Sequence, residues 1–121
     1  MIRYRLSDAA QADVIGILAW TQEQFGEATR LRYESLIVAA LRDVATQPDR
    51  PGSVERPELG AGVRSWYLRL SRDHVGTGAR VVRRPRHFLV YRSEPVLLVV
   101  GRVLHDAMEL QRHVDHERSW E

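Results

Sequence analysis

Apolar and polar residues alternate at the start of the chain and then change to a helical spacing. Residues 2–6, IRYRL, alternate apolar and basic side chains, which predicts a half-buried strand. From Ala9 to Phe25 the apolar residues follow the spacing of one helix face, with Ser7 or Asp8 as the N-cap and Gly26 as the terminator. The positions expected on the apolar stripe of this helix are Ala12, Val14, Ile15, Ile17, Leu18, Trp20 and Phe25.

The helical spacing resumes near Glu27 and ends at Gln47, because Pro48 disfavours helix in the residue before it. The buried stripe predicted for this second helix consists of Tyr33, Ile37, Ala40, Leu41 and Val44. A connection this short makes the two helices an antiparallel hairpin that can pack on a sheet.

The second half of the chain has the short apolar runs of a small sheet. Residues 48–62 are rich in proline and glycine and are predicted as a loop. Residues 63–71 form a strand, and a turn at 72–79 follows. The alternate positions of this strand that are expected to face the helices are Arg64, Trp66, Leu68 and Leu70.

A hairpin follows, with one strand at 87–91, a turn at 93–95 and a second strand that begins with the run 96–100. The second run, VLLVV, is apolar at every position, which indicates a strand in the middle of the sheet with both faces covered. Residues 106–121 form a tail, either a short helix or an extended arm.

The predicted fold is α+β, with a helical hairpin packed on a small, mostly antiparallel sheet. The element order is β-α-α-β-β-β plus the tail. A chain of 121 residues is long enough for one modest core, so we expect a single domain over residues 1–121.

Composition narrows the possible functions. The absence of cysteine excludes disulfides and thiolate metal sites, and we expect a cytoplasmic protein. No apolar run is long enough to span a membrane, and the first residues lack the apolar segment of a signal peptide. All 18 basic residues are arginine, so no lysine amine is present for Schiff-base or proton-transfer chemistry.

The sequence offers little catalytic chemistry. It lacks a glycine-rich phosphate loop, an H-E-x-x-H helix, a nucleophile elbow and a cysteine nucleophile, so we predict no catalytic residue, cofactor or metal. The segment from His113 to His116 has a metal-ligand spacing but is also typical of a hydrated tail. His105 either has its charge tuned by the adjacent Asp106 or ends a strand with a local hydrogen bond. The aromatic residues that could stack on nucleic acid or instead form core are Trp66, Phe88 and Tyr91.

A cluster of arginines precedes the hairpin, with no acidic residue until Glu94. Its members are Arg80, Arg83, Arg84 and Arg86. They are either a site for phosphate or an acidic partner segment, or a hydrated strand edge. The helical hairpin can leave a groove for a partner helix near Trp20 and Phe25, or it can be filled as core.

Three segments resemble the RelE/ParE toxin superfamily, most closely its ParE branch. They are YRLSDAAQADVIGILAWTQEQFG, VRSWYLRL and RHFLVYR…VLLVVGRVLHDAMELQRHV, and together they cover nearly the whole chain. The resemblance implies the toxin of a type II toxin–antitoxin system that is neutralised by a ParD-like antitoxin and blocks DNA gyrase without chemistry. In that case Trp20, Phe25 and the arginine cluster are our predicted antitoxin contacts, from exposure and charge alone. No direct sequence-specific nucleic-acid binding is expected.

One alternative is a RelE-like endoribonuclease that cleaves mRNA on the ribosome, and another is a non-toxic binding module of the same fold. RelE-like chains carry basic residues on the central strands and usually a tyrosine near the C-terminus. This chain departs from that pattern with Phe88, with Val103 and with no tyrosine after Tyr91. These departures favour the ParE branch, whereas Arg84, Arg86 and Arg102 keep the ribonuclease alternative open.

Overall fold

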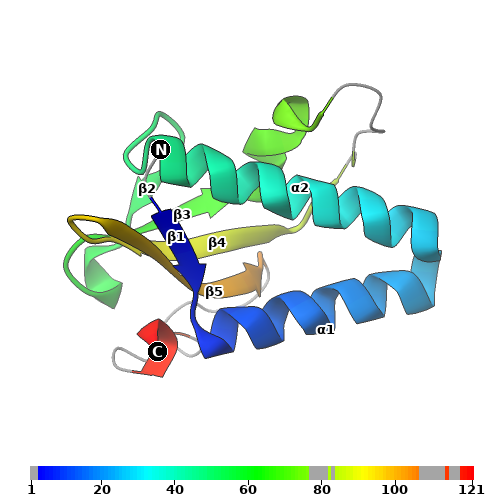
Figure 1. Cartoon of the computed structure of the whole chain (residues 1–121), viewed down its shortest axis with the longest axis horizontal. Coiled ribbons are helices and arrows are strands. Elements are labelled where there is room, and N and C mark those ends of the chain that lie inside the picture. The colour runs from blue at the N-terminus through cyan, green and yellow to red at the C-terminus, as the bar shows by residue number, and fades with distance from the viewer. Residues whose placement is uncertain (1–2, 77–81, 83, 107–113, 115–117) are drawn as a thin grey trace.

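The computed structural model describes residues 3–76, 82, 84–106, 114 and 118–121, and it has the predicted α+β architecture (Figure 1). The strands are β1 Arg3–Leu6, β2 Val54–Glu55, β3 Val63–Tyr67, β4 His87–Ser93 and β5 Leu97–His105. The helices are α1 Asp8–Phe25 and α2 Glu27–Thr46, with three short 3₁₀ helices at Pro57–Leu59, Leu68–His74 and Arg118–Trp120. In the part of the chain that the structure describes, no helix is long and apolar enough to cross a membrane.

The five strands form one mixed sheet in the order β1-β5-β4-β3-β2. Only the β1–β5 pair is parallel, which confirms a mostly antiparallel sheet. Strand β5 lies between β1 and β4, as predicted from its continuous apolar run. Strand β2 was missed, since it lies inside the predicted loop 48–62. Two residues are too few for a recognisable period, and β2 exists only because it pairs with β3.

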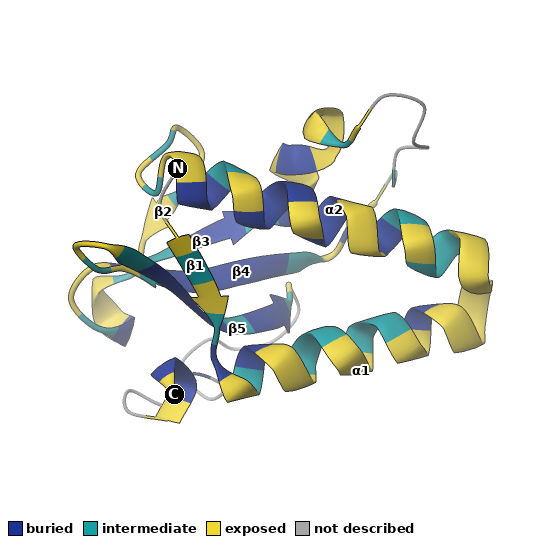
Figure 2. Cartoon of the chain, viewed as in Figure 1, coloured by how far each residue is buried: buried dark blue, intermediate teal, exposed yellow. Residues whose placement is uncertain are grey.

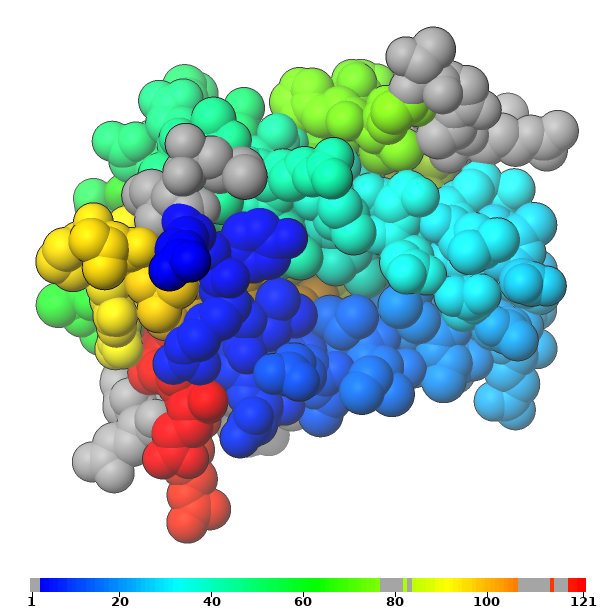
Figure 3. Space-filling model, in the orientation of Figure 1, coloured from blue at the N-terminus to red at the C-terminus, as the bar shows by residue number. Residues whose placement is uncertain are grey.

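The helical hairpin covers one face of the sheet. Ser7 begins α1 as predicted, because its hydroxyl accepts a hydrogen bond from the Ala10 amide at 3.1 Å. Gly26, at φ 91°, ends α1 and starts α2, so the two helices run antiparallel and pack on each other (Figures 1 and 3). All five residues of the predicted stripe on α2 are buried.

Both faces of β4 and β5 are buried, as Figure 2 shows by their dark colour. On the helical side Leu89 and Leu98 join the core under α1 and α2. On the opposite side Phe88 and Val99 pack with residues that come from outside the sheet, among them Val114 and Trp120. The C-terminal segment therefore closes a second small core behind the sheet.

The predicted apolar stripe of α1 was partly wrong. Ile15 is 70% exposed and Ala12 is also exposed, whereas Ala10 and Thr21 are buried and face the core. Apolar residues surround most of α1, so their period alone could not tell the sheet side from the solvent side. The side of α1 that faces the sheet carries Asp13, whose carboxylate contacts Arg102 of β5.

The predicted strand 63–71 and turn 72–79 were also corrected. Strand β3 ends at Tyr67 and a 3₁₀ helix follows to His74, so Leu70 is exposed instead of facing the helices. The cause is Asp43 on α2, whose Oδ2 atom accepts hydrogen bonds from the Ser71 hydroxyl at 2.6 Å and from His74 at 2.7 Å. These hydrogen bonds hold the segment after β3 against α2 instead of in the sheet. Residues 77–79 of the predicted turn lie outside the described residues.

Of the predicted C-terminal tail, the structure describes Asp106, Val114 and the short 3₁₀ helix Arg118–Trp120. The ring of Trp120 lies over Gly101, and the guanidinium of Arg92 lies 4.8 Å from the ring centroid. Arg5 donates hydrogen bonds to the Trp120 and Glu121 carbonyls at 2.7 and 3.2 Å. The last residues are thus anchored to the back of the sheet.

Candidate binding groove

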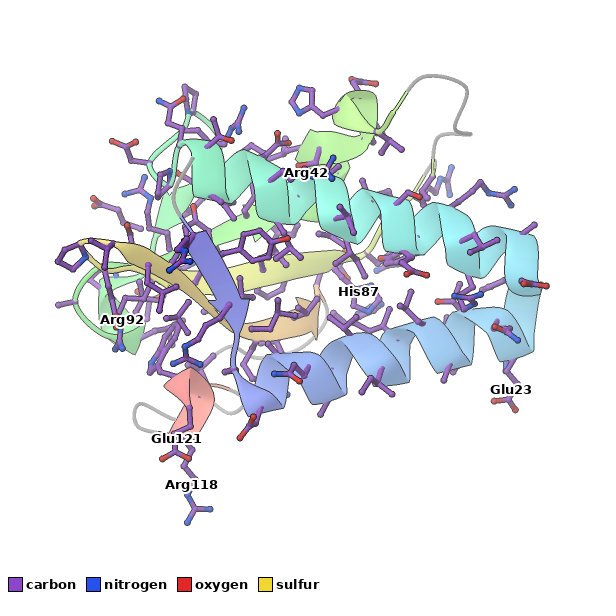
Figure 4. The ribbon with its side chains drawn as sticks, viewed as in Figure 1. Glu23, Arg42, His87, Arg92, Arg118 and Glu121 are labelled. Carbon is purple, nitrogen blue, oxygen red and sulfur yellow. The ribbon has the colours of Figure 1, made fainter. Side chains whose placement is uncertain are left out.

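A groove of about 640 Å³ opens between the two helices and the ends of β4 and β5. Its wall is apolar where α1 and α2 extend beyond the sheet, and polar where the chain enters β4 and leaves β5. Figure 4 shows His87 at the start of β4, in the space between the two helices, whereas Glu23 points away into solvent.

The apolar wall carries two exposed aromatic rings from the end of α1. Trp20 is 55% exposed and Phe25 is 63% exposed, and their ring centroids lie 5.7 Å apart in an edge-to-face arrangement. Ile17 and Val82 line the same groove, and Gly16 adds no side chain to it. Large exposed apolar side chains gathered in a concave surface are typical of a binding site.

A histidine pair lies at the polar end of the groove. His87 and His105 are opposite each other on β4 and β5, and their ring centroids are 5.3 Å apart. This pairing depends on a bulge at Gly101, since Tyr91 pairs with Val100 whereas Val90 pairs with Arg102. Without the bulge, regular pairing would set Leu104 opposite His87.

Tyr33 of α2 fixes the state of His87. The Tyr33 hydroxyl and His87 Nδ1 are 2.6 Å apart. Burial lowers the pKa of His87 to about 4, with a further contribution from His105, and burial raises the pKa of Tyr33 to about 12. His87 is therefore neutral at pH 7, and its Nδ1 shares one hydrogen bond with the Tyr33 hydroxyl.

Asp106 connects the second histidine to an arginine. Its carboxylate lies 3.3 Å from His105 Nδ1 and 3.2 Å from a guanidinium nitrogen of Arg86. The hydrogen bond from Arg86 keeps the pKa of Asp106 below its usual value. The neighbouring Arg84 is exposed, and no carboxylate of the described residues is within ion-pair distance of it. The two arginines and Asp106 leave this end with an excess of positive charge.

Asp13 holds the end of β5 against α1. Its two oxygens accept hydrogen bonds from Arg102 at 2.7 and 2.9 Å, and Oδ2 also accepts one from the Val103 amide at 2.9 Å. This pairing raises the pKa of Arg102. The contact fixes the strand that carries His105 relative to the helix that carries Trp20.

The structure brings four of the six predicted contact residues to one groove, namely Trp20, Phe25, Arg84 and Arg86. Arg80 and Arg83 lie outside the described residues. Sequence reasoning did not assign Tyr33, His87 or His105 to this site. The signal that could have found them is that each histidine lies at an outer end of the predicted hairpin.

The structure also bears on the aromatic and histidine residues that the sequence singled out. Trp66, Phe88 and Tyr91 are at most 3% exposed, so they are core and cannot stack on nucleic acid. His105 ends its strand and contacts Asp106, so the features behind both of its interpretations are present. Of the segment from His113 to His116, only Val114 is described, and it is buried.

One cluster of the described residues has the residue types of a catalytic triad but not its arrangement. Ser71, His74 and Asp43 lie together, but serine and histidine both bind the same oxygen of Asp43. Ser71 therefore lacks the histidine base that a nucleophile requires. Among the residues that the structure describes, no group of three or more potential ligands could hold a metal ion.

Comparison with known proteins gives the family. The model of the ParE toxin of the type II toxin–antitoxin system parDE matches residues 4–110. A solved structure described as "Chromosomal ParDE TA system from P. aeruginosa" has the same fold, with a TM-score of 0.61 and 16% sequence identity. The match covers 87% of this chain and 96% of that one. No curated protein matches the sequence. Because the family model spans most of its length, the chain belongs to the ParE family of type II toxins.

Proposed function

We propose that this ParE-family toxin is neutralised by a ParD-like antitoxin that binds in the groove, and that the free toxin inhibits DNA gyrase without catalysing a reaction. The observation that carries the antitoxin site is the meeting of the exposed Trp20 and Phe25 with Arg84 and Arg86 around one concave surface.

The apolar wall supplies affinity. Each of the two rings exposes more than half of its surface in the free toxin. Covering that remaining area would stabilise a complex by about 2 kcal/mol for each ring. A groove between two helices fits an amphipathic helix that inserts its apolar side chains.

The polar end supplies orientation. Arginine binds carboxylates through two parallel hydrogen bonds, so Arg84 and Arg86 favour an acidic side chain on the partner. A segment with apolar residues toward Trp20 and an acidic residue toward Arg84 fits in one direction only. Arg80 and Arg83 are proposed to extend this acidic contact.

The family resemblance supports gyrase as the target, and burial supports the absence of ribonuclease chemistry. Phe88 and Val103 occupy the positions at which RelE-like ribonucleases carry basic residues, and both side chains are buried in this chain. They offer no cation to RNA. A gyrase inhibitor of this kind would act in the cytoplasm.

The antitoxin site is tested with a ParD-like antitoxin, by measuring its affinity for purified toxin with biolayer interferometry. Replacing both Trp20 and Phe25 with alanine should weaken binding at least about a hundredfold, since each lost contact contributes more than about 1.4 kcal/mol. Ile15→Ala is the matched control, because Ile15 is even more exposed on α1 but does not line the groove. Equal losses in both variants would contradict the groove site.

The target is tested with two activity assays on the free toxin. We expect inhibition of gyrase supercoiling that is reversed by the antitoxin, with no effect on translation. Cleavage of ribosome-bound mRNA that is lost on Arg86→Ala would instead support the ribonuclease alternative.

A further inference from the structure

The polar end of the groove contains more than two arginines, and its histidines have no assigned role. His87 and His105 meet there with Tyr33 and Asp106, on three different elements of the fold. We propose that this end is a carboxylate subsite in which Arg84, Arg86 and His105 bind one acidic side chain of the antitoxin, and that His105 takes up a proton on binding. This inference rests on the proposed function.

The two histidines are not equivalent. His87 is held by the Tyr33 hydroxyl at 2.6 Å and is driven to the neutral form by burial, which keeps its pKa at about 4. His87 therefore lines the subsite as an uncharged side chain.

His105 has the features of a proton acceptor. Its side chain is 36% exposed, and it lines the groove at the end of β5. Histidine is the side chain that ordinarily changes charge between pH 5 and 8. An acidic side chain placed beside an imidazole favours the protonated ring, because the two opposite charges attract.

The charges around the pair set the direction of the effect. Burial and the neighbouring His105 lower the pKa of His87, whereas Asp106 from the end of β5 and Asp13 from α1 raise it. Arg84 and Arg86 line the same end of the groove, and like charges disfavour a further cation beside them. Tyr33 from α2 stays uncharged. In the free toxin Asp106 is shared by Arg86 and His105. An incoming carboxylate adds a second negative charge, which shifts this balance toward the imidazolium ion.

Proton uptake has a defined consequence for affinity. If the complex holds more protons than its separated parts, affinity rises as pH falls. The gain approaches about tenfold per pH unit where one full proton is taken up. Binding should therefore be tighter at pH 6 than at pH 8.

The test is isothermal titration calorimetry of the toxin with a ParD-like antitoxin. Titrations at one pH, in phosphate and in Tris, separate the buffer's heat of ionisation from the heat of binding, so their difference counts the protons taken up. We expect net uptake with wild-type toxin and its loss in His105→Gln, which keeps a polar side chain of similar size. His74→Gln is the control, because His74 pairs with Asp43 outside the groove, and it should leave the uptake unchanged.

The outcomes separate the two proposals. Absence of any binding would overturn the proposed function. Tight binding without proton uptake, or uptake that survives in His105→Gln, would overturn the carboxylate subsite and leave the antitoxin site standing. If His105→Gln does not fold, the wild-type comparison between pH 6 and pH 8 still decides, since pH-independent affinity contradicts the proposal.

Discussion

Substituting Gly101 with alanine tests how the C-terminal segment is attached to the sheet. A Cβ atom at this position would lie 2.6 and 2.8 Å from two ring carbons of Trp120, and 2.9 Å from the carbonyl oxygen of Ser119. These separations are below any ordinary contact, and one of the three atoms belongs to the backbone. Trp120 has little space to retreat, because it is 6% exposed and is covered by Arg92.

The expected cost follows from the two ways in which the clash can be relieved. If the tail stays in place, forcing an extra methyl into a filled site costs about 1–3 kcal/mol. If Trp120 leaves the sheet, the loss of its packing costs about 3 kcal/mol or more. The protein will relieve the clash in the way that costs less free energy, so Gly101→Ala should reduce the free energy of unfolding by about 2 kcal/mol. The matched control, Gly16→Ala, has nothing within 4 Å of its added Cβ and should stabilise α1 by about 0.5–1 kcal/mol.

The assay is urea denaturation followed by circular dichroism, carried out as a double-mutant cycle with Trp120→Ala. Truncation of the ring removes two of the three close contacts, so Gly101→Ala should cost at least about 1 kcal/mol less in that background. A Gly101→Ala protein as stable as wild type would refute this account. So would a cost that is the same with and without the Trp120 ring.

Three further changes test the interior of the fold by the same stability measurement. His87→Gln should flatten the pH dependence of the free energy of unfolding. His87, with its pKa near 4, is neutral in the folded protein, so it contributes stability above pH 6.5, and about 2 kcal/mol of this is lost as the pH falls to 4. An unchanged pH profile in the variant would contradict this assignment. Asp13→Asn should cost about 3 kcal/mol, since it removes the carboxylate charge that pairs with the partly buried Arg102. A cost below about 1 kcal/mol would mean that this pair is dispensable. Ser7→Ala should cost about 2 kcal/mol, because the buried hydroxyl both caps α1 at Ala10 and donates to a β5 carbonyl; Asp8→Asn is its exposed control.

The sequence predicted the parts of the fold that depend on long, regular patterns. The α2 stripe spans several turns and all of its members are buried, so the helical period was decisive. The run at 96–100 correctly indicated an inner strand, since only burial on both faces tolerates apolar residues at every position. Gly26 marked the helical turn because its positive φ suits glycine.

Features that depend on contacts between distant residues could not be predicted. Asp13 of α1 binds Arg102 of β5 on the buried side of the helix, and Asp43 of α2 binds Ser71 just beyond the end of β3. The 3₁₀ turn at the C-terminus forms where Trp120 packs over Gly101. None of these contacts produces a local period.

The candidate site was predictable only where it depends on local properties of the sequence. Exposure of Trp20 and Phe25 near the hairpin end and the charge of Arg84 and Arg86 are local properties, and the fold brings the four together. The histidine pair at the polar end instead requires the one-residue bulge at Gly101, which alters the register between β4 and β5. Sequence patterns do not indicate such a shift.

The groove as the antitoxin site is the central claim, and the three tryptophans allow a direct test of it. Trp20 lies in the groove, Trp66 in the core under the helices and Trp120 behind the sheet. In ¹H–¹⁵N spectra of the toxin titrated with its antitoxin, the Trp20 indole signal should shift most, while the signals of Trp66 and Trp120 change little. An unmoved Trp20 signal in a saturated complex, with the largest shift at Trp120, would contradict the groove and place the antitoxin on the opposite face of the sheet.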